Sequence, residues 1–82
     1  MDKNQAKEIV RMLESGKEYK TGHYHYGYIY YRYLDGFVIK KHEDFLVNIY
    51  EPTIAEMKIC EEEFVAYLIE NYDYQEFIKD IS

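Results

Sequence analysis

A tyrosine-rich run that ends at Asp35-Gly36 constrains the fold of this chain more than any other feature. The stretch HYHYGYIYYRYL, residues 23–34, is dense in tyrosine, which favours the pleated surface of a β-strand. Asp35-Gly36 separates this stretch from the apolar sequence FVIKK, residues 37–41. Asp-Gly favours a type I′ turn, in which both central residues take a positive φ. The middle of the chain is therefore predicted to contain an antiparallel hairpin.

The first strand region is expected to run from residue 17 to residue 34, with Gly22 and Gly27 as bends or bulges. Alternate side chains of an extended strand share one face. One face of this strand would carry Tyr24, Tyr26, Tyr28 and Tyr30. The other would carry His23, His25, Gly27, Ile29, Tyr31 and Tyr33. Both faces are aromatic, so the alternation leaves open which face is buried.

The remaining strand signals follow the hairpin. Residues 42–44, His-Glu-Asp, are expected to form a second turn, and residues 45–50, FLVNIY, a third strand that Pro52 ends. Residues 54–60, IAEMKIC, alternate between two sets of side chains, one of which includes Glu56 and Lys58. That pattern suits a short edge strand with a charged outer face, and a helical turn is the alternative.

The N-terminal segment is predicted to be a helix from about residue 2 to residue 15. Its apolar residues recur at the spacing of one helical face. They are Ala6, Ile9, Val10 and Leu13. Asp2 can serve as the N-cap with Gln5 as its capping-box partner, and Gly16 can end the helix in a left-handed conformation.

A second helix is predicted from Glu61, and a short third helix is predicted to open at Asp73 with a capping box. The apolar face of the second helix comprises Phe64, Val65, Leu68, Ile69 and Tyr72. The expected fold is therefore a single α+β domain, residues 1–82. It has an N-terminal helix, an antiparallel meander of three to four strands, and one or two C-terminal helices packed on one sheet face.

Charge is divided unevenly along the chain. The sequence has 16 acidic and 10 basic residues, for a formal net charge of -6. Residues 1–42 sum to +3 and residues 43–82 sum to -9. An acidic protein lacks the lysines and arginines that nucleic-acid binding requires, so we expect no direct nucleic-acid partner. The acidic half should attract basic surfaces; the alternative is that its carboxylates only keep a small domain in solution.

Signals for catalysis, metal binding and membrane insertion are weak. His23 and His25 could share a strand face, but only His42 and Cys60 remain as further soft ligands, so we expect no metal and no cofactor. Three glutamates follow Cys60 directly and should oppose thiolate formation. The sequence contains no glycine-rich phosphate loop, no N-terminal apolar segment typical of a secretory signal, and no apolar run of about 20 residues. A non-enzymatic, cytoplasmic protein is expected.

Two groups of residues are candidate partner-binding surfaces. The first is an acid surface in the C-terminal helices, which resembles a row of phosphates in its charge. It comprises Glu61, Glu62, Glu63, Glu70, Asp73, Glu76 and Asp80. The second is the tyrosine face of the first strand, where aromatic rings could anchor a protein partner, stack nucleotide bases or form a homodimer. It comprises Tyr24, Tyr26, Tyr28 and Tyr30.

The chain resembles the small acidic inhibitors carried by phages and mobile elements, anti-CRISPR proteins above all. The resemblance lies in the size, the acidity, the helix–meander–helix layout and the acidic segment EEEFVAYLIENYDYQEFIKD after the strands. It implies a protein that blocks the basic nucleic-acid groove of a CRISPR–Cas effector by mimicking DNA. The alternatives are an immunity protein or antitoxin that neutralises a basic toxin, a nucleotide-sequestering module that uses Tyr24 to Tyr33, and a structural oligomer.

Overall fold

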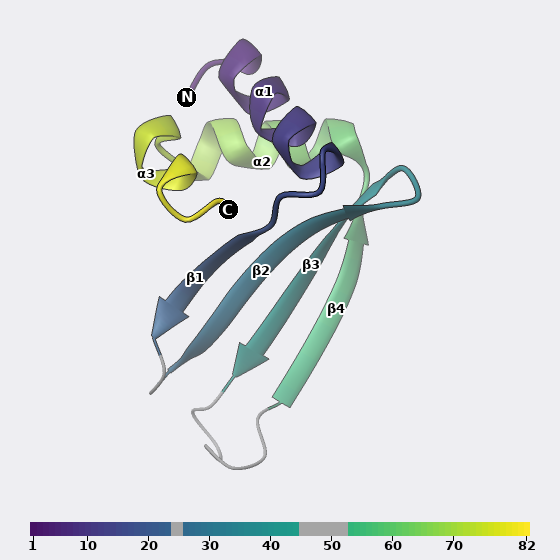
Figure 1. The fold of residues 1–82 in the computed structure, drawn as a ribbon, viewed down its shortest axis with the longest axis vertical. Helices are drawn as coiled ribbons and strands as arrows, with labels where there is room; N and C mark the ends of the chain where they lie inside the picture. The colour runs from purple at the N-terminus through teal and green to yellow at the C-terminus, as the bar shows by residue number, and fades with distance from the viewer. Residues whose placement is uncertain (24–25, 45–52) are drawn as a thin grey trace.

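The computed structural model describes residues 1–23, 26–44 and 53–82 and has the predicted α+β architecture (Figure 1). Two helices follow the strands, and one precedes them. The elements in chain order are α1 (Lys3–Glu14), β1 (Tyr19–His23), β2 (Gly27–Leu34), β3 (Phe37–Asp44), β4 (Thr53–Ile59), α2 (Glu61–Asn71) and α3 (Tyr74–Ile78).

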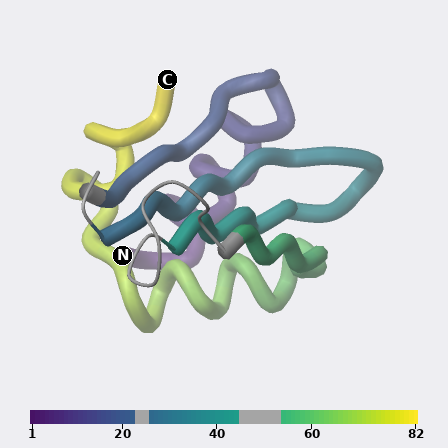
Figure 2. Tube along the Cα trace, turned by 90° about the horizontal axis from the view of Figure 1, so that it is seen from below, coloured from purple at the N-terminus to yellow at the C-terminus, as the bar shows by residue number. Residues whose placement is uncertain are grey.

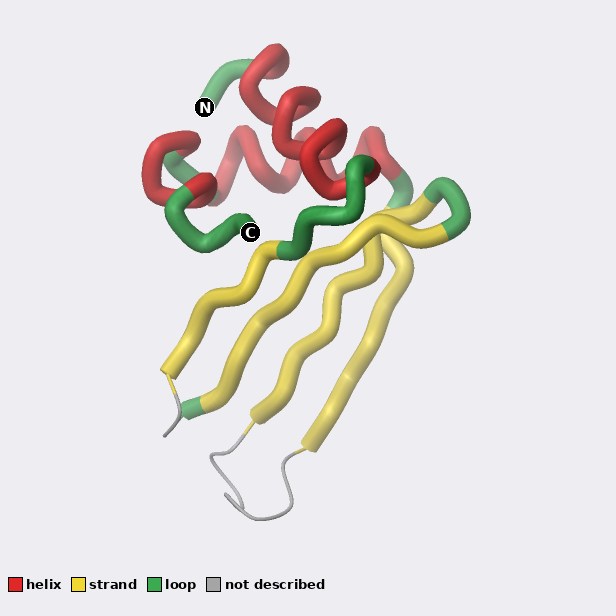
Figure 3. The backbone as a smooth tube through the Cα atoms, in the orientation of Figure 1, coloured by secondary structure: helices red, strands yellow, loops and turns green. Residues whose placement is uncertain are grey.

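The strands form one antiparallel sheet whose order follows the chain, β1-β2-β3-β4. The helices gather over one end of this sheet, and its other end extends clear of them (Figure 1; Figure 3). Tyr19 pairs with Tyr31, Tyr33 pairs with Val38, and Val38 pairs with Ile59. Because Tyr19, Tyr31 and Val38 are buried in the core, this face of the sheet packs on the helices. We call it the inner face and the opposite one the outer face.

The predicted signals at both ends of α1 are confirmed. The Asp2 carboxylate accepts a hydrogen bond from the Gln5 amide at 2.8 Å, and the Gln5 side chain accepts one from the Asp2 amide at 3.0 Å. Gly16, just after the helix, has a φ of 104°. The predicted apolar face is the buried one.

The predicted Asp35-Gly36 hairpin is also confirmed, because both residues have positive φ values, 51° and 86°. The prediction of one strand from residue 17 to residue 34 is wrong. The chain turns back before Gly27, which pairs with His23, so β1 and β2 are two strands of a hairpin. Gly27 has a φ of 125°, and a Cβ added there would lie 2.0 Å from the Glu43 carbonyl oxygen. Only glycine fits this close approach of β3.

The prediction of a turn at residues 42–44 is wrong as well, since β3 continues to Asp44. Glu43 pairs with Tyr28 on β2 and with Ile54 on β4. Backbone pairing on both sides therefore outweighs the local preference of these polar residues for a turn. The predicted strand at residues 45–50 lies outside the described residues. The predicted edge strand at residues 54–60 is confirmed as β4, with the side chains of Glu56 and Lys58 exposed.

An aromatic cluster joins the sheet to the C-terminal helices. The Tyr19 ring stacks on Phe77 with centroids 3.9 Å apart and an interplanar angle of 8°. Tyr31 lies 5.1 Å from Phe64 of α2, and its hydroxyl lies 3.3 Å from that of Tyr72. These five residues, which we call the aromatic cluster, bring β1 and β2 against α2, α3 and the segment between them.

Replacing Phe77 with alanine should destabilise the protein strongly. Phe77 is 1% exposed, and its loss removes the ring against which Tyr19 stacks. A Phe→Ala change in a core costs about 3–5 kcal/mol, a large part of the stability of a small domain. Phe37→Ala is the matched control, since Phe37 is 40% exposed. Urea unfolding followed by circular dichroism should show a much lower midpoint for Phe77→Ala, and equal midpoints would contradict this role.

Candidate functional site

The C-terminal helices hold the whole net charge of the protein. Residues 61–82 contain seven acidic residues and one basic residue, Lys79, which gives -6, the value for the complete chain. The acidic residues in this region are all exposed. The remaining 60 residues are neutral in sum. The net negative charge that would attract a basic partner is therefore concentrated in this region.

Two of these carboxylates lie on the outward side of α2. Phe64, Val65 and Leu68 are buried and define its inward side. At 100° per residue, Glu63 and Glu70 fall opposite this apolar side. They are two helical turns apart, about 10 Å along the axis. Within the described residues, neither carboxylate has a cation within ion-pair distance.

Tyr67 lies between these two glutamates, and the sequence analysis did not single it out. It is four residues after Glu63 and three before Glu70, so it neighbours both along α2, and the Lys40 ammonium of β3 lies 5.6 Å from its ring centroid. Its ring is 38% exposed and lies 5.9 Å from that of Tyr72. The spacing of Tyr67 from Glu63 and Glu70 is the sequence signal that could have identified this residue. We call Glu63, Tyr67 and Glu70 the α2 stripe.

Glu61 and Glu62 have a different environment, at the start of α2. They line a depression of about 560 Å³ between α1 and α2, together with Lys3 and Lys7. Together with Glu63, they also occupy the first turn of α2, where the helix dipole favours negative charge. Nearby lysines and the helix end thus offset part of their charge.

Among the described residues, the other predicted acids have local partners that the two acids of the α2 stripe lack. Asp73 caps α3, and its carboxylate accepts a hydrogen bond from the Glu76 amide at 3.1 Å. Glu76 forms an ion pair with Lys79 at 3.1 Å. Asp80 lies at the β1 edge, where its carbonyl oxygen accepts a hydrogen bond from the Lys20 amide. Asp73 and Glu76 therefore have structural roles.

The predicted tyrosine face is divided as well. Tyr24 lies outside the described residues, and Tyr26, 65% exposed, lies in the turn before β2. Tyr28 and Tyr30 lie on the outer face of β2, because Tyr31 faces the core. Their ring centroids are 6.3 Å apart. The α2 stripe belongs to the helices on the inner face, so the structure does not bring these two groups together.

Lysines flank the two outer tyrosines. The Lys20 ammonium lies 4.6 Å from the Tyr28 ring centroid and 5.4 Å from that of Tyr30. The Lys41 ammonium lies 5.2 Å from the Tyr30 ring. Lys41 also forms an ion pair with Glu43 at 3.1 Å. This part of the outer face combines aromatic rings with positive charge.

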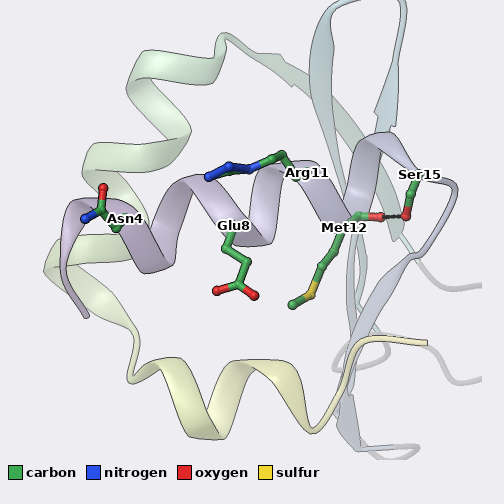
Figure 4. Close-up of a pocket in the computed structure, with 5 residues that line it drawn as sticks. All are labelled: Asn4, Glu8, Arg11, Met12 and Ser15. Atoms are coloured by element: carbon green, nitrogen blue, oxygen red, sulfur yellow. Dashed lines mark hydrogen bonds between the residues drawn. The ribbon is translucent and has the colours of Figure 1, made fainter.

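A depression on α1 offers no further chemistry. It is lined by Asn4, Glu8, Arg11, Met12 and Ser15 (Figure 4). The Glu8 carboxylate accepts a hydrogen bond from the Tyr74 hydroxyl of α3 at 3.0 Å. The Ser15 hydroxyl donates to the Met12 carbonyl oxygen at 2.6 Å. The side chains of Glu8 and Ser15 are therefore already engaged in hydrogen bonds within the protein.

The remaining candidates for metal binding and nucleophilic chemistry are separated. His25 lies outside the described residues, His23 ends β1 and His42 is on β3. In the part of the chain that the structure describes, no three residues of the types His, Cys, Asp and Glu form a group that could hold a metal ion. Cys60 is a half-buried free thiol at the start of α2.

Among the described residues, none of the helices has the length and apolar character needed to cross a membrane.

Comparison with known proteins gives no assignment. No protein-family model matches the chain, and neither a curated protein sequence nor a solved structure matches it.

Burial of the core tyrosines should make stability sensitive to alkaline pH. Desolvation by burial raises the pKa of Tyr19 from 10.0 to about 12, and it raises the pKa of Tyr31 further. Above pH 10.0 the unfolded chain releases these protons and the folded protein retains them. The free energy of unfolding should therefore be constant below this range and fall as pH rises towards 12.

Tyr19→Phe tests this dependence, because it removes the ionisable hydroxyl and keeps the stacked ring. Its free energy of unfolding, measured by urea titration from pH 8 to pH 12, should fall less steeply than that of the wild type. Tyr26→Phe, at an exposed position, should follow the wild type. Identical slopes for the Tyr19→Phe variant and the wild type would refute the role of Tyr19 burial.

Proposed function

We propose that this protein is a non-enzymatic inhibitor that binds the basic nucleic-acid groove of a defence nuclease, such as a CRISPR–Cas effector. The α2 stripe is the contact surface. Its two carboxylates take the place of phosphates, and the Tyr67 ring supplies an aromatic anchor between them. The observation that carries the proposal is the position of Glu63 and Glu70, both exposed on one side of a helix that contains no basic residue.

The distribution of charge supports this choice of surface. A groove that binds nucleic acid presents lysines and arginines to a row of phosphates. Residues 61–82 carry -6, and within this region Glu63 and Glu70 have neither a capping role nor a cation within ion-pair distance among the described residues. Glu61 and Glu62 extend the negative region towards the start of α2. Asp73 and Glu76 serve α3 and contribute less.

Replacing Glu63 and Glu70 with lysine reverses the charge at both positions and should abolish capture of the partner. In the Glu63→Lys, Glu70→Lys double variant, two expected ion pairs become like-charge contacts. Losing charge pairs of this kind costs about 2–5 kcal/mol, which is about 30-fold to several thousand-fold in affinity. The measurement is affinity capture from a lysate of the organism that carries the gene, with captured proteins identified by mass spectrometry. Asp73 is left intact because it caps α3.

Glu14→Lys with Glu18→Lys is the matched control, since it changes net charge equally and both residues are exposed outside α2. The wild type and this control should capture a nucleic-acid enzyme, and DNA added first should prevent capture. The proposal fails if the captured protein has no nucleic-acid groove or if both double variants bind it equally. Capture of a toxin would instead favour the immunity-protein alternative.

A second candidate function, nucleotide sequestration, is favoured by the outer face of the sheet. Tyr28 and Tyr30 present adjacent rings, and the Lys20 and Lys41 ammonium groups lie within 5.4 Å of the ring centroids. Aromatic rings on strands stack bases, and lysines beside them meet phosphates.

Thermal stabilisation by nucleotides tests this second candidate. A ligand that binds only the folded protein stabilises it and raises its melting temperature, increasingly so as the ligand concentration exceeds the Kd. Nucleoside mono- and triphosphates should therefore raise the melting temperature of the wild type. Tyr30→Ala should lose this increase, and Tyr67→Ala, on the other side of the molecule, should keep it. No shift with any nucleotide would remove this candidate.

A further inference from the structure

The two edges of the sheet are not equivalent. The start of the β1 edge is covered by the C-terminal segment, which lies beside it (Figure 2). Tyr19 pairs with Ile81, and Glu18 and Ser82 exchange backbone hydrogen bonds of 2.9 and 3.0 Å. At the other edge, no described residue pairs with the free side of β4. Such an edge offers a row of backbone donors and acceptors to another strand.

The side chains of β4 are unusually apolar for an open edge. Ile54 is 56% exposed and Met57 is 57% exposed, although both are large and hydrophobic. By the sheet register, Ala55, Met57 and Ile59 belong to the inner face. Ile54, Glu56 and Lys58 belong to the outer face. An open edge that exposes two large apolar side chains is suited to burial against a second strand.

The sequence of β4 is complementary to itself in one antiparallel register. A twofold axis perpendicular to the sheet places inner-face residues of one copy opposite inner-face residues of the other. A shift of one strand by a single residue would break this match, so the allowed registers differ by shifts of two residues. With Met57 opposite Met57, each Glu56 faces a Lys58 and each Ala55 faces an Ile59. One register either way places Glu56 opposite Glu56 or Lys58 opposite Lys58. Opposite charges across strands stabilise pairing, and like charges oppose it.

We propose that β4 is a homodimerisation edge. Two copies of the chain pair their β4 strands antiparallel about Met57 and form one eight-stranded sheet. Four charged residues, Glu56 and Lys58 of each copy, select the register on the outer face, and the Met57 side chains meet on the inner face. In one copy the helices gather over one end of the sheet (Figure 1). Because the paired β4 strands run in opposite directions, the helices of the two copies lie at opposite ends of the joined sheet.

Light scattering after size exclusion tests the proposal across a wide range of concentrations. The wild type should approach twice the 10.0 kDa mass of one chain as concentration rises. Lys58→Glu alone, or Glu56→Lys alone, should weaken the dimer about tenfold or more, because each creates two like-charge contacts. An equimolar mixture of the two single variants should recover dimer, since every contact in the mixed pair joins opposite charges. Circular dichroism of each variant verifies its fold.

A cysteine cross-link tests the register directly, in a Cys60→Ser background. Met57→Cys should form a disulfide-linked dimer when oxidised with diamide, because the twofold axis brings the two new thiols together. Ala55→Cys should not, since each of these thiols would face Ile59 of the other copy.

Three results would overturn the proposal. The first is a wild-type protein that stays monomeric at every concentration. This result counts against the proposal even if β4 binds a different protein. The second is a dimer that neither single charge variant weakens. The third is equal cross-linking at positions 55 and 57.

Discussion

Contact between Tyr19 and Phe77 is the interaction on which the rest of the structure depends. A chain of 82 residues has a thin core, so a few large rings supply much of its buried apolar area. The stacked pair, with centroids 3.9 Å apart, attaches the last helix to the first strand. Tyr31 and Phe64 attach α2 to the centre of the sheet in the same way. With α3 in place, the C-terminal residues reach β1 and cover its edge.

This anchoring also determines what stays uncovered. The helices are held at one end of the sheet, and the strands extend beyond them (Figure 3). The outer face then carries Tyr28 and Tyr30 with their neighbouring lysines, and β4 keeps a free edge among the described residues. The aromatic cluster thus separates three surfaces: the α2 stripe, the outer face and the β4 edge. The α2 stripe lies on the helix side of the sheet, whereas the β4 edge adjoins the outer face, since Glu56 pairs with Lys41 across the strands and lines one depression with Tyr30.

Acidic residues that look alike in the sequence have different physical environments. Asp73 stabilises the start of α3 by accepting an amide hydrogen bond, and Glu76 is paired with Lys79. Glu61 and Glu62 lie at a helix N-terminus beside Lys3 and Lys7. A carboxylate that is already paired gains little from a new cation, because the new contact must replace an existing one. Glu70 has no such role, and Glu63, although it shares the first turn of α2, has no cation within ion-pair distance among the described residues, which is why the proposed inhibition rests on them.

Local signals in the sequence correctly predicted those parts of the fold that depend on a few neighbouring residues. The Asp2–Gln5 capping box, the Asp35-Gly36 turn and the Asp73 cap each act within about four residues, so their chemistry can be read directly. Apolar periodicity predicted the buried face of α1 for the same reason, and the charge imbalance follows from composition alone.

Tertiary structure decided which of two equally aromatic strand faces is buried, where the tyrosine-rich run turns, and how far β3 extends. Tyr31 is buried because it meets Phe64 and Tyr72, residues at least 33 positions away in the chain. Likewise, β3 continues through Glu43 because strands on both sides pair with it. Strand pairing and burial depend on contacts between distant segments, and local preferences do not encode them. The spacing of residues 63, 67 and 70 is readable in the sequence, but the exposure of Tyr67 follows only from how α2 packs.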